Sequence, residues 1–244
     1  MRKSEYILEY IMCLFFPNRC VFCGALTAPC EYICGNCEQE LPFITGETCP
    51  HCGAQKDRCS CNGRHGGYYD SAASPLYYTG SVKKCIHDFK FRSMRLNSRC
   101  LAGLMAETCR ARFPDVSFDY VAYIPLNRRA FRKRGYNQSY LLARRISQEL
   151  GVPLGRDLLI KLYDTYNQHD CRAVERSGNL LGVFDVDSRC DIRDKTILLV
   201  DDVRTTGNTL NECGKMLFLN GARAVYCLTA ALAVTEKDSD NTEV

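Results

Sequence analysis

The chain has 244 residues, of which 46% are hydrophobic and 25% are charged, and its formal net charge is +4. This length is sufficient for one sizeable domain and a small one, and the mild charge does not by itself indicate a nucleic-acid-binding protein. The 17 cysteines are odd in number, and ten of them precede residue 62. This distribution argues against a secreted, disulfide-bonded framework and predicts metal ligation in a cytoplasmic protein.

The first sixteen residues contain basic residues and then an apolar stretch that ends before Pro17. Glu9 interrupts this stretch and no small-residue cleavage site follows it, so we do not expect a signal peptide. The stretch is too short to span a bilayer, and no stable membrane span is expected. Its apolar residues fall at helical spacing, which predicts a short amphipathic helix over 1–16 that packs on the protein. Attachment to a membrane surface is the alternative.

Four close pairs of cysteines follow within residues 17–66. The first two pairs are Cys20, Cys23, Cys34 and Cys37, and the next two are Cys49, Cys52, Cys59 and Cys61. Each pair can offer two thiolates to one ion, and four thiolates in a tetrahedral array are the usual structural zinc site. We therefore predict a zinc-ribbon domain over 17–66 with one or two structural Zn²⁺ ions. Reduced thiols without a metal are the alternative.

The second set of cysteines departs from the regular spacing, because one residue instead of two separates Cys59 from Cys61. Either both bind the ion with altered geometry, or His51 or His65 replaces one of them. Zinc ribbons can serve only to stabilise a segment that is too small to bury a core, or they can bind nucleic acid or a protein partner. The spacing leaves both roles open.

Residues 63–69 are typical of a linker, and the sequence after them alternates between strand and helix patterns. We expect strands over 74–78, 118–125, 158–162, 196–201 and 223–230, and helices over 80–91, 96–113, 136–151 and 210–219. This alternation predicts an α/β domain over 67–235 with a mostly parallel sheet flanked by helices. Ligands of such sheets bind beyond the carboxyl ends of the strands. The polar, acidic segment 236–244 is predicted to be disordered.

A dense group of basic residues follows the strand expected at 118–125. They are Arg128, Arg129, Arg132, Lys133 and Arg134, with Arg144 and Arg145 further on and no acidic residue among them. Five positive charges in seven residues repel one another unless an anion lies among them. This loop therefore suits a pyrophosphate or the backbone of a nucleic acid. A solvated start of a helix is the alternative.

The segment 196–210 is the most informative part of the chain. Four apolar residues, Ile197 to Val200, fit a strand buried on both faces, and two carboxylates, Asp201 and Asp202, follow at its end. A loop of small residues then opens a helix, so backbone N–H groups and threonine hydroxyls can hold a phosphate. The carboxylates can accept hydrogen bonds from the hydroxyls of a ribose. The alternative is a turn with an N-capping threonine and two solvated acids.

This segment resembles the motif with which type I phosphoribosyltransferases bind 5-phosphoribosyl 1-pyrophosphate (PRPP). The resemblance implies a type I phosphoribosyltransferase-like fold, in which Asp201 and Asp202 are the catalytic residues and contact the ribose 2′- and 3′-hydroxyls. It also implies a 5′-phosphate site formed by Thr205, Thr206, Gly207, Asn208 and Thr209.

Further segments resemble the signature of the ComF family, competence-associated proteins with a zinc-ribbon head and a phosphoribosyltransferase-like body. The matching residues are Lys90 to Arg92, Ile124 to Arg129, Arg132 to Gln138, Leu141 to Ala143, Asp164, Thr165, Gln168, Arg176, Asn179, Gly182 and Phe184. With the cysteines and the PRPP motif, the resemblance covers about residues 17–232. The sequence departs from the family pattern at Asn127, where histidine is common, at the Cys59–Cys61 spacing, and at Cys171, where leucine is usual.

The resemblance assigns Asn127, Arg128 and Arg129 to a pyrophosphate loop, and residues 163–179 to a mobile loop that closes over the site. Gln168 and Arg176 are then the expected ligand contacts of the mobile loop, with local loop and helix-cap hydrogen bonds as the alternative. Mg²⁺ would be bound mainly through the oxygen atoms of PRPP itself.

Two functions from different classes follow. One is a phosphoribosyltransferase with an unassigned acceptor, acting in nucleotide metabolism or in DNA uptake and natural competence. The other is a competence factor that binds single-stranded DNA through the zinc ribbons and Arg132, Lys133 and Arg134, contacts a competence helicase, and uses PRPP as a regulatory ligand. A PRPP-sensing scaffold for other proteins is a third hypothesis.

Overall fold

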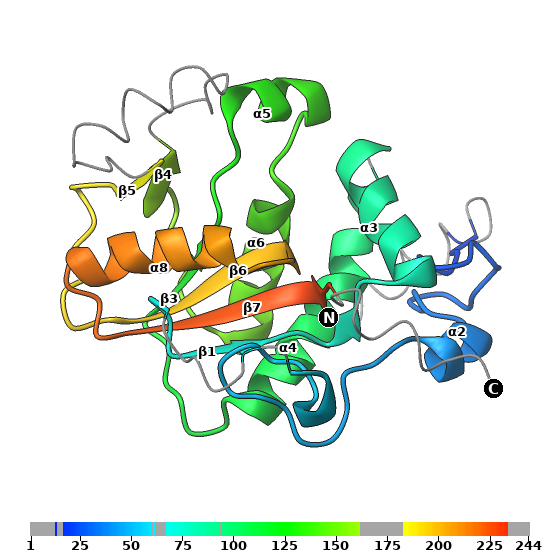
Figure 1. Ribbon diagram of the computed structural model, residues 1–244. Coiled ribbons are helices and arrows are strands. Elements are labelled where there is room, and N and C mark those ends of the chain that lie inside the picture. The colour runs from blue at the N-terminus through cyan, green and yellow to red at the C-terminus, as the bar shows by residue number, and fades with distance from the viewer. Residues whose placement is uncertain are drawn as a thin grey trace, which may run out of the picture.

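The computed structural model describes residues 13, 17–59, 61, 67–92, 94–161 and 183–233 (Figure 1). The amphipathic helix expected over 1–16, apart from Cys13, lies outside these residues. So do the expected mobile loop over 163–179, with Gln168 and Arg176, and the acidic tail over 236–244. Among the helices that are described, none has the length and the apolar character needed to cross a bilayer.

The centre of the molecule is a five-stranded parallel sheet. Its strands are β1 (Ser71–Ala73), β2 (Leu76–Tyr77), β3 (Tyr120–Tyr123), β6 (Thr196–Arg204) and β7 (Ala224–Leu232). The order is β1-β7-β6-β3, and β2 also pairs with β7, further along that strand than β1. This arrangement confirms the predicted α/β class with a parallel sheet.

Helices cover both faces of the sheet. They are α3 (Gly80–Phe91), α4 (Asn97–Arg112), α6 (Gln138–Leu150) and α8 (Asn208–Leu219). The first three form one layer and α8, drawn in orange in Figure 1, forms the other. Successive residues of β6 point to opposite faces, so Leu198 packs into the layer of α3, α4 and α6, whereas Leu199 packs on the side of α8. Burial on both faces explains the continuous apolar run that precedes the two acids.

The structure shortens one predicted strand and places another in a separate sheet. Of the strand expected at 74–78, only β2 over Leu76–Tyr77 is present, whereas β1 precedes the predicted range. Pro75, which has no N–H to donate to a sheet, lies between β1 and β2. The strand expected at 158–162 is β4 (Leu159–Lys161), which pairs antiparallel with β5 (Phe184–Val186) in a two-stranded sheet outside the parallel one.

The basic segment that was expected as a loop is the helix α5 (Arg128–Arg134). The Asn127 side chain caps this helix by accepting a hydrogen bond from the N–H of Ala130 at 2.6 Å, and Gly135, with a φ of 75°, ends it. The basic residues of its last turn lie at the negative end of the helix dipole, where they stabilise the helix. The prediction of a loop was wrong, because the dense positive charge was weighed above the capping signals of Asn127 and Gly135.

The cysteine-rich segment packs against the helical layer and against one edge of the sheet. It contains α2 (Gly35–Glu40) and the short 3-10 helix η1 (Lys56–Arg58). Its first half joins the core around α3 and α4 through Phe22 and Leu41. In its second half, the N–H of Ile44 donates to the carbonyl of Pro75 at 2.9 Å. The segment therefore shares its core with the α/β domain.

Candidate functional site

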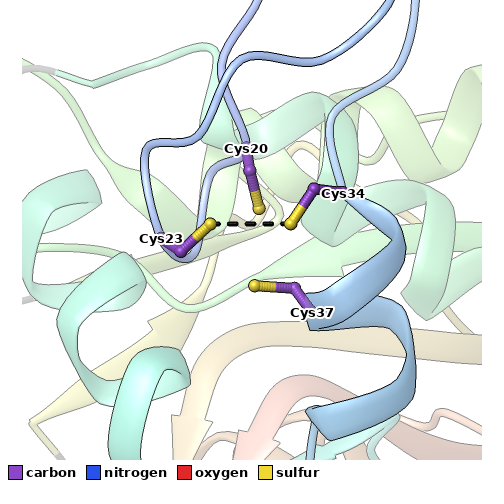
Figure 2. Close-up of side chains that lie close together, drawn as sticks. All are labelled: Cys20, Cys23, Cys34 and Cys37. Carbon is purple, nitrogen blue, oxygen red and sulfur yellow. Dashed lines mark hydrogen bonds between the residues drawn. The ribbon is translucent and has the colours of Figure 1, made fainter.

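Two clusters of four cysteines lie in the cysteine-rich segment. One contains Cys20, Cys23, Cys34 and Cys37, and the other contains Cys49, Cys52, Cys59 and Cys61. Within each cluster, all four sulfur atoms lie within 4.8 Å of one another. Figure 2 shows the side chains of the first cluster converging from two loops and from the start of α2. The structure therefore brings together both predicted sets of ligands.

The spacing of the sulfur atoms fits a tetrahedral metal site. The Sγ atoms of Cys23 and Cys34 are 3.6 Å apart, and so are those of Cys52 and Cys59. A disulfide bond has a length of about 2.05 Å, whereas a tetrahedron with zinc–sulfur bonds of about 2.3 Å has edges of about 3.8 Å. Each cluster is thus suited to one structural Zn²⁺ ion with four thiolate ligands.

The second cluster uses both residues of the short pair, Cys59 and Cys61. The N–H of Cys61 donates to the Cys59 sulfur at 3.4 Å, which fits a tight turn between the two ligands. The four converging ligands are all cysteines, so His51 replaces neither member of the short pair. Its ring is stacked on that of Tyr69, with 4.8 Å between the centroids and 7° between the planes. His65 lies outside the described residues.

Backbone amides favour the thiolate form of the first cysteine of each cluster. Burial raises the pKa of the Cys20 thiol, but backbone N–H donors, chiefly that of Cys23, outweigh burial and lower the pKa to about 6. Burial also raises the pKa of Cys49, and hydrogen bonds led by the N–H of Cys52 again lower it overall. Thiolate is the form that binds zinc, so both turns are suited to ligation.

A cleft of about 400 Å³ opens at the carboxyl ends of β3 and β6. It is lined by Lys90, Ile124, Pro125, Leu126, Asn127, Arg134, Gln138, Ser139, Lys161, Val183, Phe184, Asp201, Asp202, Thr209 and Glu212. This end of a parallel sheet is where α/β proteins bind their ligands. The cleft combines cationic, anionic and neutral polar side chains, which suits a ligand with both hydroxyl and phosphate groups.

Asp201 and Asp202 lie at this cleft, and each has a partner from a different helix. The Nζ of Lys90, at the end of α3, is 2.7 Å from Oδ1 of Asp202, and the two side chains are 20% and 10% exposed. The hydroxyl of Ser139, in the first turn of α6, donates to Oδ1 of Asp201 at 2.7 Å. The two acids therefore connect α3 and α6 to the carboxyl end of β6.

The surroundings favour the neutral form of Asp201. Burial raises the pKa of this carboxyl, and the negative charge of Asp202 raises it further. Hydrogen bonds from the Ser139 hydroxyl and the Asp202 amide, together with the charge of Lys90, offset this only in part, so the pKa is about 7. A ligand that donates hydrogen bonds to Asp201 would stabilise the charged form that the protein alone disfavours.

The loop between β6 and α8 offers donors for a phosphate. Gly207 is buried, has a φ of 83°, and directly precedes the first residue of α8. Thr205, Thr206 and Asn208 are exposed, and Thr209 lines the cleft. The N–H of Asn208 donates to Oγ1 of Thr206 at 3.4 Å, which holds the loop against the start of α8. A helix leaves the N–H groups of its first turn without backbone partners within the helix, so this end of α8 and the threonine hydroxyls suit an anion.

Arg204 connects this loop to the second cysteine cluster. Its Nη1 donates to the carbonyl of Cys52 at 3.1 Å, and its Nη2 donates to the hydroxyl of Tyr69 at 3.3 Å. A Cβ atom at Gly207 would lie 3.1 Å from Nε of Arg204, and the φ of 83° also favours glycine, so a larger residue at this position would strain the loop and displace the arginine. The candidate phosphate loop therefore rests on a side chain that is held by the zinc-ribbon segment.

The polar residues of the α5 region divide between the cleft and the solvent. Asn127 and Arg134 line the cleft, and Nη1 of Arg134 donates to Oε1 of Gln138 at 3.1 Å. The other four basic residues of the same helix are exposed, namely Arg128, Arg129, Arg132 and Lys133. The structure thus places Arg134, expected to bind nucleic acid, at the cleft, whereas Arg128 and Arg129, expected to bind pyrophosphate, are not among the residues that line it.

Lys90 and Ser139 contact the two acids of the candidate site, although the sequence analysis predicted no role for either of them. Lys90 precedes Asp202 by 112 residues, and only the packing of α3 beside the end of β6 brings them together. A signal was present in each case. Lys90 begins the Lys90 to Arg92 segment of the family resemblance, and Ser139 directly follows Gln138, where another matching segment ends.

Two family models match the chain: a double zinc ribbon domain over residues 11–68 and a phosphoribosyl transferase domain over residues 137–242. Competence protein F of Haemophilus influenzae is 29% identical over 218 residues, which are 83% of this chain and 92% of that protein. DNA utilization protein YhgH of Escherichia coli K12 is 31% identical over 164 residues, which are 64% of this chain and 70% of that protein. Competence protein ComFC of Bacillus subtilis is 28% identical over 210 residues, or 82% and 83% of the two chains.

Two solved structures are similar to the chain. One is a purine phosphoribosyltransferase from Pyrococcus horikoshii, with 21% identity over 55% of this chain and 73% of that chain and a TM-score of 0.36. The other is an adenine phosphoribosyltransferase, with 15% identity over 62% and 85% of the two chains and a TM-score of 0.36.

Proposed function

The chain belongs to the ComF family, which joins a double zinc ribbon to a phosphoribosyltransferase domain, and on this basis we propose that its cleft binds PRPP together with Mg²⁺. The observation that carries the proposal is the pair of Asp201 and Asp202 at the end of β6, held by Ser139 and Lys90. The glycine-containing loop that opens α8 lies directly after them. Acceptors for a diol and donors for a phosphate are therefore adjacent, as a sugar phosphate requires.

Each part of PRPP has a partner of matching chemistry. The ribose hydroxyls donate to the carboxylates of Asp201 and Asp202, and the 5′-phosphate accepts hydrogen bonds from the loop over 205–209. The pyrophosphate faces the cationic side of the cleft, which is lined by Arg134 and Lys161. Mg²⁺, held mainly by oxygen atoms of PRPP itself, would neutralise part of the negative charge of the pyrophosphate.

The reaction that this site suits is the transfer of the phosphoribosyl group. The bond between C1′ and the pyrophosphate oxygen breaks, that oxygen keeps the electron pair, and an acceptor nucleophile forms the new bond to C1′. The protein contributes position and charge: Asp201 and Asp202 fix the ribose and stabilise the positive charge that develops on it, and Arg134 stabilises the leaving group.

Two zinc sites complete the proposal. Each tetracysteine cluster binds one Zn²⁺ through its four thiolates and stabilises a segment that has only short helices of its own. Elemental analysis of the purified protein is expected to give two zinc ions per chain. Cys23→Ser and Cys59→Ser, one in each cluster, are each expected to lose one ion, and a wild-type content of one ion would contradict the second site.

Calorimetric titration of the zinc-replete protein with PRPP and Mg²⁺ tests the cleft. We expect saturable binding that Asp201→Asn/Asp202→Asn abolishes while the unfolding transition is retained. The matched control is Glu107→Gln/Asp115→Asn, which removes the same charge at exposed positions away from the cleft and should bind normally. Release of pyrophosphate in the presence of an acceptor distinguishes a transferase from a PRPP-binding protein.

Exposed basic residues and the competence relatives favour a second candidate. Arg132 and Lys133 project from α5 into solvent, where they suit the backbone of single-stranded DNA that is passed on to a helicase. PRPP would then be a regulatory ligand. For this candidate, Arg132→Gln/Lys133→Gln weakens DNA binding and reduces its salt dependence, whereas Asp201→Asn/Asp202→Asn spares it. Loss of DNA binding in a folded Asp201→Asn/Asp202→Asn variant would contradict separate sites.

A further inference from the structure

Two adjoining hollows lie beside the cleft. The smaller, of about 210 Å³, is lined by Arg95, Arg144 and Arg145 among others. The larger, of about 570 Å³, is lined by several aromatic residues. Both are lined by Arg95 and Leu141, so they lie side by side. We call them together the arginine–aromatic groove, defined by Arg95, Arg144, Arg145, Tyr123, Phe131 and Tyr140.

One end of the groove carries positive charge without matching acids. Among the described residues, no carboxylate lies within 4.0 Å of the guanidinium groups of Arg95, Arg144 or Arg145. Nε of Arg145 instead donates to the hydroxyl of Ser98 at 3.1 Å. Burial and the guanidinium groups of Arg99 and Arg144 lower the pKa of Arg145, and the negative charge of Glu149 offsets this only in part. Clustered guanidinium groups repel one another, and an anion such as a phosphate would relieve that repulsion.

The other end of the groove is aromatic. The rings of Tyr123 and Tyr140 meet edge to face, with 5.3 Å between their centroids and 73° between their planes. Phe131, on α5, is 50% exposed at the same hollow. Asp157, the one carboxylate in the lining, accepts a hydrogen bond from the Tyr123 hydroxyl at 3.0 Å, so its charge lies at the end away from Arg144 and Arg145. Such a surface suits the flat face of a nucleobase.

Arg95 lies at the junction of the two ends. Its guanidinium carbon is 4.8 Å from the centroid of the Tyr136 ring, and it lines both hollows. A phosphate on the arginine side and a base on the aromatic side would therefore be separated by a residue that can contact both. The larger hollow also shares Pro125 and Leu126 with the candidate PRPP cleft, so the groove leads up to that cleft.

We propose that the arginine–aromatic groove binds a nucleoside phosphate, with the phosphate at Arg95, Arg144 and Arg145 and the base against Tyr140 and Phe131. The ligand is either a free nucleotide or one residue of a nucleic-acid strand, which share this chemistry. The site adjoins the PRPP cleft but does not include the residues proposed to hold PRPP or the exposed basic residues of α5, and it does not depend on the proposed function.

Titration of the full-length, zinc-replete protein with thymidine 5′-monophosphate tests the proposal, with and without saturating PRPP and Mg²⁺. We expect Arg144→Gln/Arg145→Gln to weaken binding at least tenfold, and Arg144→Gln alone, at an exposed position, to weaken it in the same direction. Tyr140→Ala should weaken it about tenfold, because it removes a ring on which the base stacks, and Tyr140→Phe, which keeps the ring, should bind like the wild type.

The control is Lys83→Gln/Lys84→Gln, which removes two charges at exposed positions of α3 outside the groove. An equal loss of affinity in this control, or equal binding of thymidine without its phosphate, would overturn the proposal. So would complete displacement of the nucleotide by PRPP, which would place it in the cleft. If PRPP fails to bind at all, the nucleotide titration is unaffected, so the two failures are distinguishable.

A short oligothymidylate separates the two sources of the ligand. Much tighter binding than that of the mononucleotide, with a steeper dependence on salt, identifies a strand, and equal affinity identifies a free nucleotide. In both cases the Arg144→Gln/Arg145→Gln variant must lose affinity for the proposal to hold.

Discussion

The Nζ of Lys90 lies 2.7 Å from Oδ1 of Asp202, and this ion pair joins the end of α3 to the carboxyl end of β6. The positive charge of Lys90 compensates the negative charge of Asp202, at a position where Asp201 and Asp202 are adjacent and largely buried. The candidate ribose site therefore depends on a residue outside the motif that predicts it. The predictions below follow from this and from other contacts of the site.

Lys90→Met should destabilise the protein by about 1–3 kcal/mol, because it leaves the charge of Asp202 largely buried without its partner. Lys90→Met/Asp202→Asn should lose less than the sum of the two single changes, since neither charge then remains unpaired. Urea unfolding monitored by circular dichroism measures these free energies. Lys84→Gln, on the exposed face of the same helix, is the control. Additive losses in the double variant would show that the pair does not contribute.

Asp201→Asn should stabilise the protein at neutral and alkaline pH. The pKa of Asp201 is raised to about 7 in the folded state, so its stabilising contribution is complete below the unfolded pKa of about 4 and is lost as the pH rises towards 7. Asparagine removes this loss, and the gain in unfolding free energy should reach about 2–4 kcal/mol above pH 7.

This gain should be absent near pH 4 and grow between about pH 4 and pH 7, when wild type and variant are compared at each pH by urea unfolding. The comparison at equal pH cancels the titration of the zinc ligands. Asp115→Asn, at an exposed position, should show no gain in unfolding free energy that grows over this pH range. A destabilised Asp201→Asn variant at pH 8 would contradict the raised pKa.

PRPP should protect the second zinc site more than the first. Arg204 touches the candidate phosphate loop at Gly207 and donates to the carbonyl of Cys52, a ligand of the second cluster, so binding at the loop and binding of that ion are coupled. A chromogenic chelator should extract zinc in two phases, and PRPP with Mg²⁺ should slow one of them.

Arg204→Lys tests this coupling, because lysine keeps the charge but cannot donate to both Cys52 and the Tyr69 hydroxyl in the same geometry. The variant is expected to bind PRPP more weakly and to lose the protection of zinc. Cys59→Ser identifies which phase belongs to the second cluster. Undiminished preferential protection of the second ion by PRPP in the Arg204→Lys variant would exclude this route.

Gly53→Ala should be more damaging than Gly24→Ala, although both glycines have a positive φ, 73° and 82° respectively. A Cβ at Gly53 would lie 2.7 Å from the carbonyl oxygen of Ala72, whereas one at Gly24 would lie in open space. We expect Gly24→Ala to lower the free energy of unfolding by about 1 kcal/mol, because of the backbone conformation alone. Gly53→Ala should lower the free energy of unfolding further and should also reduce the zinc content. Thermal unfolding and zinc content measure both.

The helices and the parallel strands could be predicted because their signals are local. The helix expected at 80–91 is α3 with the same bounds, and Ile197 to Val200 form the buried centre of β6. The cysteine pairs were equally clear, because thiolate ligands come in short, recurrent spacings. The choice between Cys61 and His51 in the second cluster needed the structure, since only the stacking of His51 on Tyr69 shows where that ring is engaged.

The contacts that complete the site could not be predicted from the sequence, because they join segments that are far apart in the chain. Lys90 reaches Asp202, and Arg204 reaches Cys52, across 112 and 152 residues. The basic segment after Asn127 was expected as a loop, since charge density was weighed above the capping signals of Asn127 and Gly135. For the same reason Arg134 was assigned to nucleic acid, although the last turn of α5 directs it to the cleft.

The most direct test of the account is a crystal structure of the protein grown with PRPP and Mg²⁺. The account predicts difference density with the ribose hydroxyls at Asp201 and Asp202 and the 5′-phosphate at residues 205–209. It also predicts the pyrophosphate on the side of Arg134. Density for PRPP in any other place, or in the reverse orientation with the pyrophosphate at Gly207, would contradict the assignment of the cleft.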